Sequence, residues 1–316
     1  MNETPGGMKR WLVAARTFAL PASSMPVVFG TAMAVAVGGA AFRPGLFLAA
    51  LLAMMILHTG ANMLSDVRDS QKGLDREVSP VSGAIVRGWL TEAQVRRAAV
   101  GLLAVGSAIG LWLVARAGLP LLWIGLVGVA LGVSYSMGPG LKYRALGDLT
   151  VFLNFGVLGA LGAWTVQTGR LSWWPVLWAV PMSLLVVGIL HANNWRDIAT
   201  DRERAAVRTF AGHLGDIGSL RYYQFLVFGP FGMVTALVLL RWGWPSVAWA
   251  MPWPLLLVWL SFPLAWRLNG KALRRAAPAA PLDFITLDGA TAQLNLAFGV
   301  LATIGLVLHR ILERTA

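Results

Sequence analysis

Polar side chains with helical spacing end one of the long apolar stretches of this sequence. His58, Asn62, Asp66 and Asp69 follow one another at intervals of four, four and three residues. On a continuous helix these four side chains lie on one face. An amide and two carboxylates would therefore be presented together where the helix leaves its apolar surroundings.

A second cluster of similar composition ends another apolar stretch. Asn193, Asp197 and Asp201 are separated by four residues each, and Asn194 precedes Asp197 by three. If the helix continues through them, it also presents amide and carboxylate groups together. His191 comes shortly before this cluster, just as His58 comes shortly before Asn62 in the first cluster. Both histidines are candidates for a supporting role behind a site, and the alternative is that they are packed, hydrogen-bonded core residues.

Carboxylates at this density need compensating cations or water when they lie beside apolar segments. An Asp costs roughly 2.5–3.5 kcal/mol at the centre of a membrane helix, and four carboxylates also repel one another. Mg²⁺ prefers oxygen ligands and typically binds one or two carboxylates together with substrate phosphates. We therefore expect Mg²⁺ that bridges to a diphosphate, with these ligands: Asp66, Asp69, Asp197 and Asp201. The alternative is a set of solvated helix ends paired with Arg68, Arg196 and Arg202.

The composition of the chain indicates that these clusters belong to a membrane protein. Of 316 residues, 57% are hydrophobic and 13% are charged, whereas soluble domains carry about 25% charged residues. This excludes a soluble globule and a disordered chain. The sequence has no cysteine, which excludes disulfides, thiolate metal sites and a cysteine nucleophile.

The apolar stretches define the architecture. A membrane-spanning helix needs about 20 mostly apolar residues. Nine stretches qualify, namely 12–38, 45–65, 98–115, 119–138, 149–168, 174–195, 222–240, 246–266 and 290–309. We therefore predict an all-α polytopic membrane protein with nine transmembrane helices.

Charge is distributed unequally between the two sides of such a bundle. With nine spans, 20 of the 26 Lys and Arg residues fall on the side of the N-terminus and 6 on the other. Positive residues concentrate in cytoplasmic loops, so we expect the N-terminus to be cytoplasmic. All nine Asp residues share that side, which places the site there too. The net charge of +12 then indicates membrane lipid, and no nucleic acid, as the partner.

Four segments of the sequence form a further pattern. The first is Trp11 to Pro21, with Pro26 and Gly30 after it. The others are Asn62-x₃-Asp66-x₂-Asp69-x₂-Lys72-Gly73-x-Asp75, Tyr135-Ser-Met-Gly-Pro139-Gly-Leu-Lys142-Tyr143-Arg144-x-x-Gly147-Asp148, and Asn193-Asn194-x-Arg196-Asp197-x₃-Asp201-Arg202 followed by Arg208-Thr209. Together they resemble the UbiA superfamily of membrane prenyltransferases, and most closely its 1,4-dihydroxy-2-naphthoate polyprenyltransferases of the MenA type.

The resemblance implies a single membrane prenyltransferase domain over residues 1–316, with nine helices around a central cavity. Cytoplasmic loops at about 66–97, 196–221 and 267–289 are expected to cap it. An allylic polyprenyl diphosphate would bind at the cytoplasmic mouth through Mg²⁺, with its tail in an apolar channel open to lipid. The prenyl group would pass to a small aromatic acceptor, 1,4-dihydroxy-2-naphthoate in menaquinone biosynthesis, with release of diphosphate and CO₂. We expect this enzyme in a bacterial inner membrane.

The resemblance also assigns roles to individual residues. The catalytic residues would be Asp66, Asp69, Asp197 and Asp201. The diphosphate would be bound by Asn62, Lys142, Arg144, Arg208, Tyr135, Asn193, Asn194 and Arg16. Supporting roles would fall to Asp75, Asp148, His58 and His191.

The sequence departs from the family pattern at two places. Ser65 stands where the family has Asn directly before the first Asp, so Asn62 is the candidate to supply that amide to the metal. Ala206-Val207-Arg208-Thr209 replaces Gly-Lys-x-Thr. A phosphate-binding lysine is thereby missing, and Arg208 is the candidate for its role.

Three alternatives predict different properties. Another UbiA-type reaction would use 4-hydroxybenzoate, haem or a lipid-ether acceptor. An ion or solute transporter would place its carboxylates near the bilayer midplane on broken helices, whereas here they lie at one surface. A non-catalytic sterol- or quinone-binding scaffold would keep its function after substitution of Asp66 or Asp197.

Overall fold

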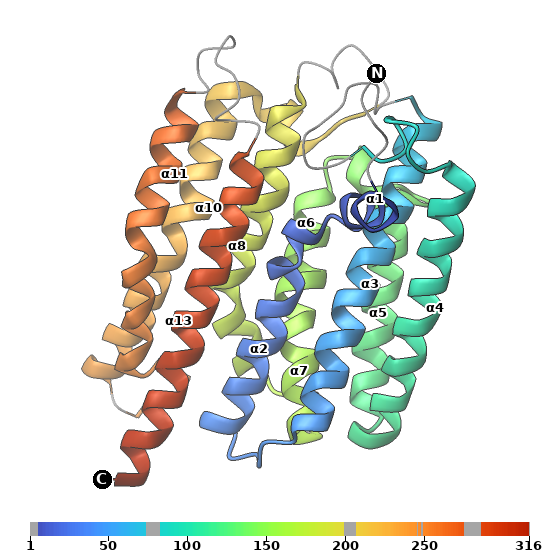
Figure 1. Cartoon of the computed structure of the whole chain (residues 1–316). Helices are drawn as coiled ribbons and strands as arrows, with labels where there is room; N and C mark the ends of the chain where they lie inside the picture. Colours follow the sequence, from blue (N-terminus) through green and yellow to red (C-terminus); the bar gives the residue numbers. More distant parts are fainter. Residues whose placement is uncertain are drawn as a thin grey trace.

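The computed structural model describes residues 6–73, 83–198, 207–244, 246–247, 249–274 and 286–315, and within these ranges the chain is helical. The long helices run side by side in one bundle, and α1 and the C-terminal end of α13 lie at opposite ends of it (Figure 1). The elements are α1 (Gly7–Ala14), η1 (Thr17–Ala19), α2 (Pro21–Ala36), α3 (Pro44–Gln71), α4 (Glu92–Ala117), α5 (Leu119–Ser136), η2 (Leu141–Tyr143), α6 (Gly147–Val151), η3 (Phe152–Leu158), α7 (Gly159–Thr168), α8 (Trp174–Arg196), α10 (Phe210–Gly243), η4 (Trp253–Ser261), α11 (Phe262–Arg274) and α13 (Leu287–Thr315).

Eight helical stretches in the described part of the chain are long and apolar enough to cross a membrane. They confirm the all-α membrane fold and match eight of the nine predicted spans. The predicted span 246–266 differs, because a 3₁₀ helix, η4, runs directly into α11. Proline lacks an N–H group and cannot make the bond to the carbonyl four residues earlier. Pro263, the second residue of α11, therefore interrupts a uniform α-helix over this span.

The first predicted span, 12–38, is also divided. Arg16 adopts the left-handed conformation with φ 47° and ψ 48°, which ends α1 and lets the membrane helix begin at Thr17. Helix α1 lies across the end of the bundle and is seen nearly end-on in Figure 1. It exposes Met8 and Leu12 and buries Ala14, as expected for an amphipathic helix in the plane of a membrane surface.

Helix α8 lies at the centre of the packing. Trp178, Leu185 and Trp195 on α8 are almost completely buried and belong to a core cluster with residues of α2, α10 and α13. In contrast, α4 and α5 expose Leu111 and Trp123. An apolar exposed surface of this kind is suited to lipid, so α4 and α5 form an outer edge of the bundle.

Close approach of α2 and α7 depends on a glycine. A Cβ atom built on Gly30 would lie 2.3 Å from the backbone oxygen of Ala160. Small residues at such crossings allow the backbones of membrane helices to pack tightly.

We expect Gly30→Ala to lower the melting temperature of the protein in detergent. The added methyl group must push α2 from α7, and overpacking typically costs about 1–3 kcal/mol. Gly232→Ala on α10 is the matched control, because nothing lies within 4 Å of its Cβ position. Thermal unfolding followed by tryptophan fluorescence measures both variants, and equal melting temperatures would contradict the α2–α7 contact.

Candidate active site

Helix α3 presents the first polar cluster as the spacing predicts. It runs without a break from Pro44 to Gln71, and it buries both Asp66 and Asp69. His58 lies two turns before Asp66, and its Nδ1 is 2.9 Å from the Ser23 hydroxyl on α2. His58 is thus a packed, hydrogen-bonded core residue, as the alternative interpretation predicted.

Asp66 is neutralised by the residue at which α1 ends. The Arg16 guanidinium donates to Asp66 Oδ1 over 2.5 Å, and the carboxylate side chain is only 7% exposed. The left-handed backbone conformation at Arg16 is unfavourable for a non-glycine residue. The ion pair with Asp66 helps to stabilise this conformation. Arg16 therefore belongs to the site, although its carboxylate partner is 50 residues away in the sequence.

Asp69 is surrounded by donors from the loop after α5. The Lys142 ammonium pairs with Asp69 Oδ2, and the Tyr143 hydroxyl donates to Asp69 Oδ1 over 2.7 Å. Lys142 also donates to the Ser65 hydroxyl over 2.7 Å. Burial, together with the neighbouring Asp69 carboxylate, raises the pKa of the Tyr143 phenol well above its usual range, so the phenol stays protonated as a donor.

Tyr143 and Ser65 are site residues to which the sequence analysis assigned no role. Tyr143 stands within the third motif without a predicted role, and Ser65 is a position at which the sequence departs from the family pattern. A hydroxyl one helical turn before Asp69, and an aromatic residue between Lys142 and Arg144, were the available signals. Serine at position 65 has a physical consequence, because its oxygen accepts the hydrogen bond from Lys142.

The segment after the second motif joins this site through backbone atoms. The Arg208 amide donates to the Tyr143 carbonyl oxygen over 3.1 Å, and Arg144 and Arg208 form an isolated parallel bridge. Two candidate diphosphate-binding arginines thus lie beside each other, next to Lys142. Tyr135 lies close as well, with its ring centroid 5.8 Å from the Lys142 ammonium.

The second cluster differs from its prediction because α8 ends at Arg196. Asp197 lies just beyond the helix, with its side chain 41% exposed. The predicted face with Asn193 and Asp197 four residues apart on one continuous helix is therefore not formed by α8. The Arg196 guanidinium binds Asn193, Asp197 and, from α13, Asp288. Asn194 is half-buried on the last turn. The predicted residues Asp75 and Asp201 lie outside the described ranges.

Asp148 and His191 form a separate pair deeper in the bundle. Asp148 is the second residue of α6, and its Oδ2 lies 3.4 Å from Nδ1 of His191 on α8. Both side chains are buried. The two residues that were assigned supporting roles separately therefore belong together.

The carboxylate oxygens of α3 are suitable ligands for a hard cation such as Mg²⁺. The described residues do not by themselves form a complete set of metal ligands. Within those ranges, no group of three acidic or histidine side chains converges on one point. Two buried carboxylates that share one helix face supply oxygen ligands of the kind that Mg²⁺ binds. Such a pair fits an ion whose remaining ligands come from a substrate phosphate. The shared ion between α3 and the α8 end stays a prediction.

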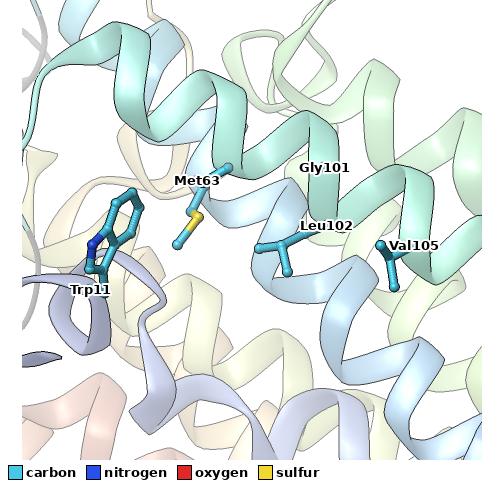
Figure 2. Close-up of a pocket in the computed structure, with 6 residues that line it drawn as sticks. Trp11, Met63, Gly101, Leu102 and Val105 are labelled. Carbon is cyan, nitrogen blue, oxygen red and sulfur yellow. The ribbon is translucent and has the colours of Figure 1, made fainter.

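A separate apolar hollow of about 450 Å³ lies between α1, α3 and α4. Figure 2 shows Trp11 of α1 facing Met63 of α3, with Leu102 and Val105 of α4 farther along. Met63 lies one turn before Asp66 on α3. The lining contains no residue from α5 to α8, so this hollow is an outer groove and not the predicted central channel.

Comparisons with known proteins are consistent with this geometry. The model of the UbiA prenyltransferase family matches residues 23–287. The chain is 31% identical over 301 residues to UbiA prenyltransferase domain-containing protein 1 of Mus musculus, covering 94% of this chain and 84% of that protein. The Xenopus tropicalis protein of the same name is 32% identical, with 94% and 81% covered. These names support the family and not the MenA-type subgroup.

Solved structures show the same fold at low sequence identity. The apo structure of a UbiA homolog from Aeropyrum pernix K1 has a TM-score of 0.63 at 19% identity, over 91% of this chain and 97% of that chain. A UbiA homolog from Archaeoglobus fulgidus, bound to DMAPP and Mg²⁺, has a TM-score of 0.61 at 15% identity, over 93% and 99%. With a family model that covers most of its length, the chain belongs to the UbiA prenyltransferase family and is a membrane-embedded prenyltransferase.

Proposed function

We propose that this protein transfers a polyprenyl group from an allylic diphosphate to a small aromatic acceptor in a Mg²⁺-dependent reaction. The observation that carries the proposal is the arrangement at the end of α3. Asp66 and Asp69 are buried carboxylates, and the cations that neutralise them, Arg16 and Lys142, come from other elements. Such a mixture of oxygen ligands and cations suits a metal–diphosphate group.

The related structures support this donor chemistry. The homolog from Archaeoglobus fulgidus was solved with DMAPP and Mg²⁺ and also with GPP and Mg²⁺. DMAPP and GPP are allylic diphosphates, the class of donor proposed here. We assign Asn62, Asp66, Asp69, Asp197 and Asp201 to the metal and Arg16, Tyr135, Lys142, Arg144, Asn193, Asn194 and Arg208 to the diphosphate.

The protein's own groups would stabilise the departing diphosphate. When the C–O bond of the donor breaks, negative charge develops on the leaving oxygen, and prearranged cations lower the barrier by attracting it. Bound Mg²⁺ supplies Lewis-acid stabilisation of the same charge. Lys142 is positioned for this role because Ser65 and Asp69 hold its ammonium group from two sides. Tyr143 fixes Asp69 in turn.

The acceptor and the cellular setting are finer parts of the proposal. The motif resemblance supports 1,4-dihydroxy-2-naphthoate as acceptor and menaquinone as the final product class. The excess of Lys and Arg on the side of the N-terminus supports a cytoplasmic site at an inner membrane. One catalytic membrane domain extends over the chain, and membrane lipid surrounds it.

A lipid-ether acceptor is the second candidate. Digeranylgeranylglyceryl phosphate synthase has the same fold, with a TM-score of 0.57 at 16% identity over 96% of this chain and 98% of that chain. Its name indicates a glyceryl phosphate substrate, in which the acceptor is an alcohol and not an aromatic ring.

Substitution of the buried carboxylates should abolish most activity. We expect Asp66→Asn and Asp69→Asn each to slow Mg²⁺-dependent diphosphate release by about 100-fold or more, because metal stabilisation of several kcal/mol is lost. Release is measured with purified protein, a prenyl diphosphate and an acceptor, with and without EDTA.

Glu92→Gln is the matched control for these carboxylates. Glu92 begins α4 and accepts from the Ser70 hydroxyl over 2.8 Å, so it lies beside the end of α3 without holding Arg16 or Lys142. Full activity of Asp66→Asn and Asp69→Asn at normal expression would instead support a non-catalytic scaffold. Ion flux without diphosphate release would support a transporter.

Lys142 should contribute through charge and not only through hydrogen bonds. Lys142→Gln retains a donor for Ser65 and Asp69 but loses the positive charge. We expect kcat to fall by about 100-fold, as for removal of one prearranged electrostatic group. Lys271→Gln on α11 is the control for loss of a lysine elsewhere. Equal kcat values for the two variants would remove Lys142 from the diphosphate site.

The acceptor can be identified directly. We expect mass spectrometry to show prenylated product, with loss of CO₂, when the protein is incubated with Mg²⁺, a set of prenyl diphosphates and 1,4-dihydroxy-2-naphthoate. Parallel reactions contain 4-hydroxybenzoate, haem or a glyceryl phosphate lipid. Product only from one of these parallel acceptors would replace the naphthoate assignment while leaving prenyl transfer in place.

A further inference from the structure

A carboxylate and an imidazole face each other inside the bundle. Asp148 is 6% exposed and His191 is 0% exposed, and Oδ2 and Nδ1 are 3.4 Å apart. Within the described part of the chain, neither carboxylate oxygen nor either ring nitrogen has a hydrogen-bond partner. A buried polar group without a partner has lost its hydration without compensation, which is unfavourable. Two such side chains in contact therefore point to a polar ligand that completes them.

The walls around this pair are apolar and aromatic. The Tyr222 ring meets His191 edge-on, with centroids 4.8 Å apart, and the Phe210 ring packs edge-on against Tyr222 at 5.1 Å. Tyr135 and Phe155 belong to the same hydrophobic cluster as Tyr222. Aromatic rings favour offset and edge-to-face contacts with one another, so these walls suit a flat aromatic ring that carries a polar substituent.

Tyr135 connects the pair with the charged site. A Cβ atom at Gly147, the residue before Asp148, would lie 3.6 Å from Cε2 of Tyr135. The same tyrosine ring lies 5.8 Å from the Lys142 ammonium, which pairs with Asp69. The Asp148–His191 pair is thus separated from the proposed diphosphate site by about one aromatic side chain. An acceptor ring bound beside Tyr135 would therefore lie next to the proposed diphosphate site.

We propose that His191 is the general base that accepts the hydroxyl proton of the aromatic acceptor, and that Asp148 positions it. The inference rests on the proposed function, since it concerns the second substrate of that reaction. With substrate bound, Asp148 would accept from Nδ1–H of His191, which would leave Nε2 as the proton acceptor. A 3.4 Å separation is longer than a normal hydrogen bond, and such contacts commonly tighten when substrate binds. The buried carboxylate also stabilises the imidazolium that forms.

The proposed step balances in atoms and electrons. The acceptor hydroxyl gives its proton to Nε2, and its oxygen pushes an electron pair into the ring. A ring carbon then bonds to the allylic carbon of the donor, while the C–O bond breaks and its electron pair leaves with diphosphate. The ring regains aromaticity when the joined carbon loses a proton to water, or a carboxyl group as CO₂. The oxygen recovers its proton from the imidazolium.

The test compares acceptors whose hydroxyl is neutral or already ionised. We expect His191→Gln to lower kcat for a neutral phenolic acceptor by about 100-fold or more, the usual contribution of a general base. An acceptor with the same ring and an electron-withdrawing group, ionised in water at the assay pH, should restore most of this loss. Asp148→Asn should behave in the same way, because its amide favours the other histidine tautomer. The KM for the prenyl diphosphate should stay unchanged.

A second histidine–carboxylate pair, in which the histidine is buried and the carboxylate is exposed, provides the control. His309 Nε2 lies 3.2 Å from Glu313 Oε1 on α13, and we expect His309→Gln and Glu313→Gln to retain wild-type kcat with both acceptors. If His191→Gln does not fold, Asp148→Asn, which keeps the volume of its side chain, carries the same comparison.

The outcomes separate the inference from the function on which it rests. Wild-type kcat in His191→Gln, or an equal loss with neutral and ionised acceptors, would overturn the base while prenyl transfer stands. If the wild-type protein prenylates no hydroxylated aromatic compound, the aromatic-acceptor function fails, and the inference fails with it. Selective rescue by the ionised acceptor supports both.

Discussion

The site depends on neutralising two buried carboxylates on α3. A carboxylate that is removed from water needs a partner charge or several donors, because its desolvation cost is otherwise prohibitive. Arg16 supplies that charge to Asp66, whereas Asp69 receives Lys142 and the Tyr143 hydroxyl. The partners come from elements before and after α3 in the chain. The same contacts that neutralise the acids therefore fix the segment after α1 and the loop after α5 at one end of the bundle.

The two acidic motifs consequently differ in their physical setting. Asp66 is held inside the protein, whereas Asp197 lies past the end of α8 with its side chain 41% exposed. Arg196 binds Asn193, Asp197 and Asp288 together, so the end of α8 is tied to α13. The α3 acids thus supply the buried half of the proposed metal site, and the α8 end supplies its more exposed half.

Below this charged end, the interior changes character over a short distance. Lys142 lies close to Tyr135, and that ring belongs to a cluster of aromatic and aliphatic side chains, with Asp148 and His191 as a buried ionisable pair nearby. A diphosphate needs cations and oxygen ligands, whereas an allylic cation and an aromatic ring need protection from water. In the proposed reaction, one ionisable pair set among apolar side chains would take up the hydroxyl proton of the acceptor.

Composition and hydropathy by themselves determined the membrane class, eight of the spans and the common face of the α3 cluster, since these depend on local periodicity and on the cost of exposing backbone to lipid. Periodicity could not reveal that α1 breaks at Arg16, that η4 is a 3₁₀ helix or that α8 stops before Asp197. Those outcomes follow from local backbone geometry and capping. Only the tertiary structure decided that Lys142 and Tyr143 meet Asp69 and that Asp148 meets His191. Contacts between residues far apart in the chain arise from helix packing and from the need to satisfy buried polar groups, and neither leaves a periodic signal in the sequence.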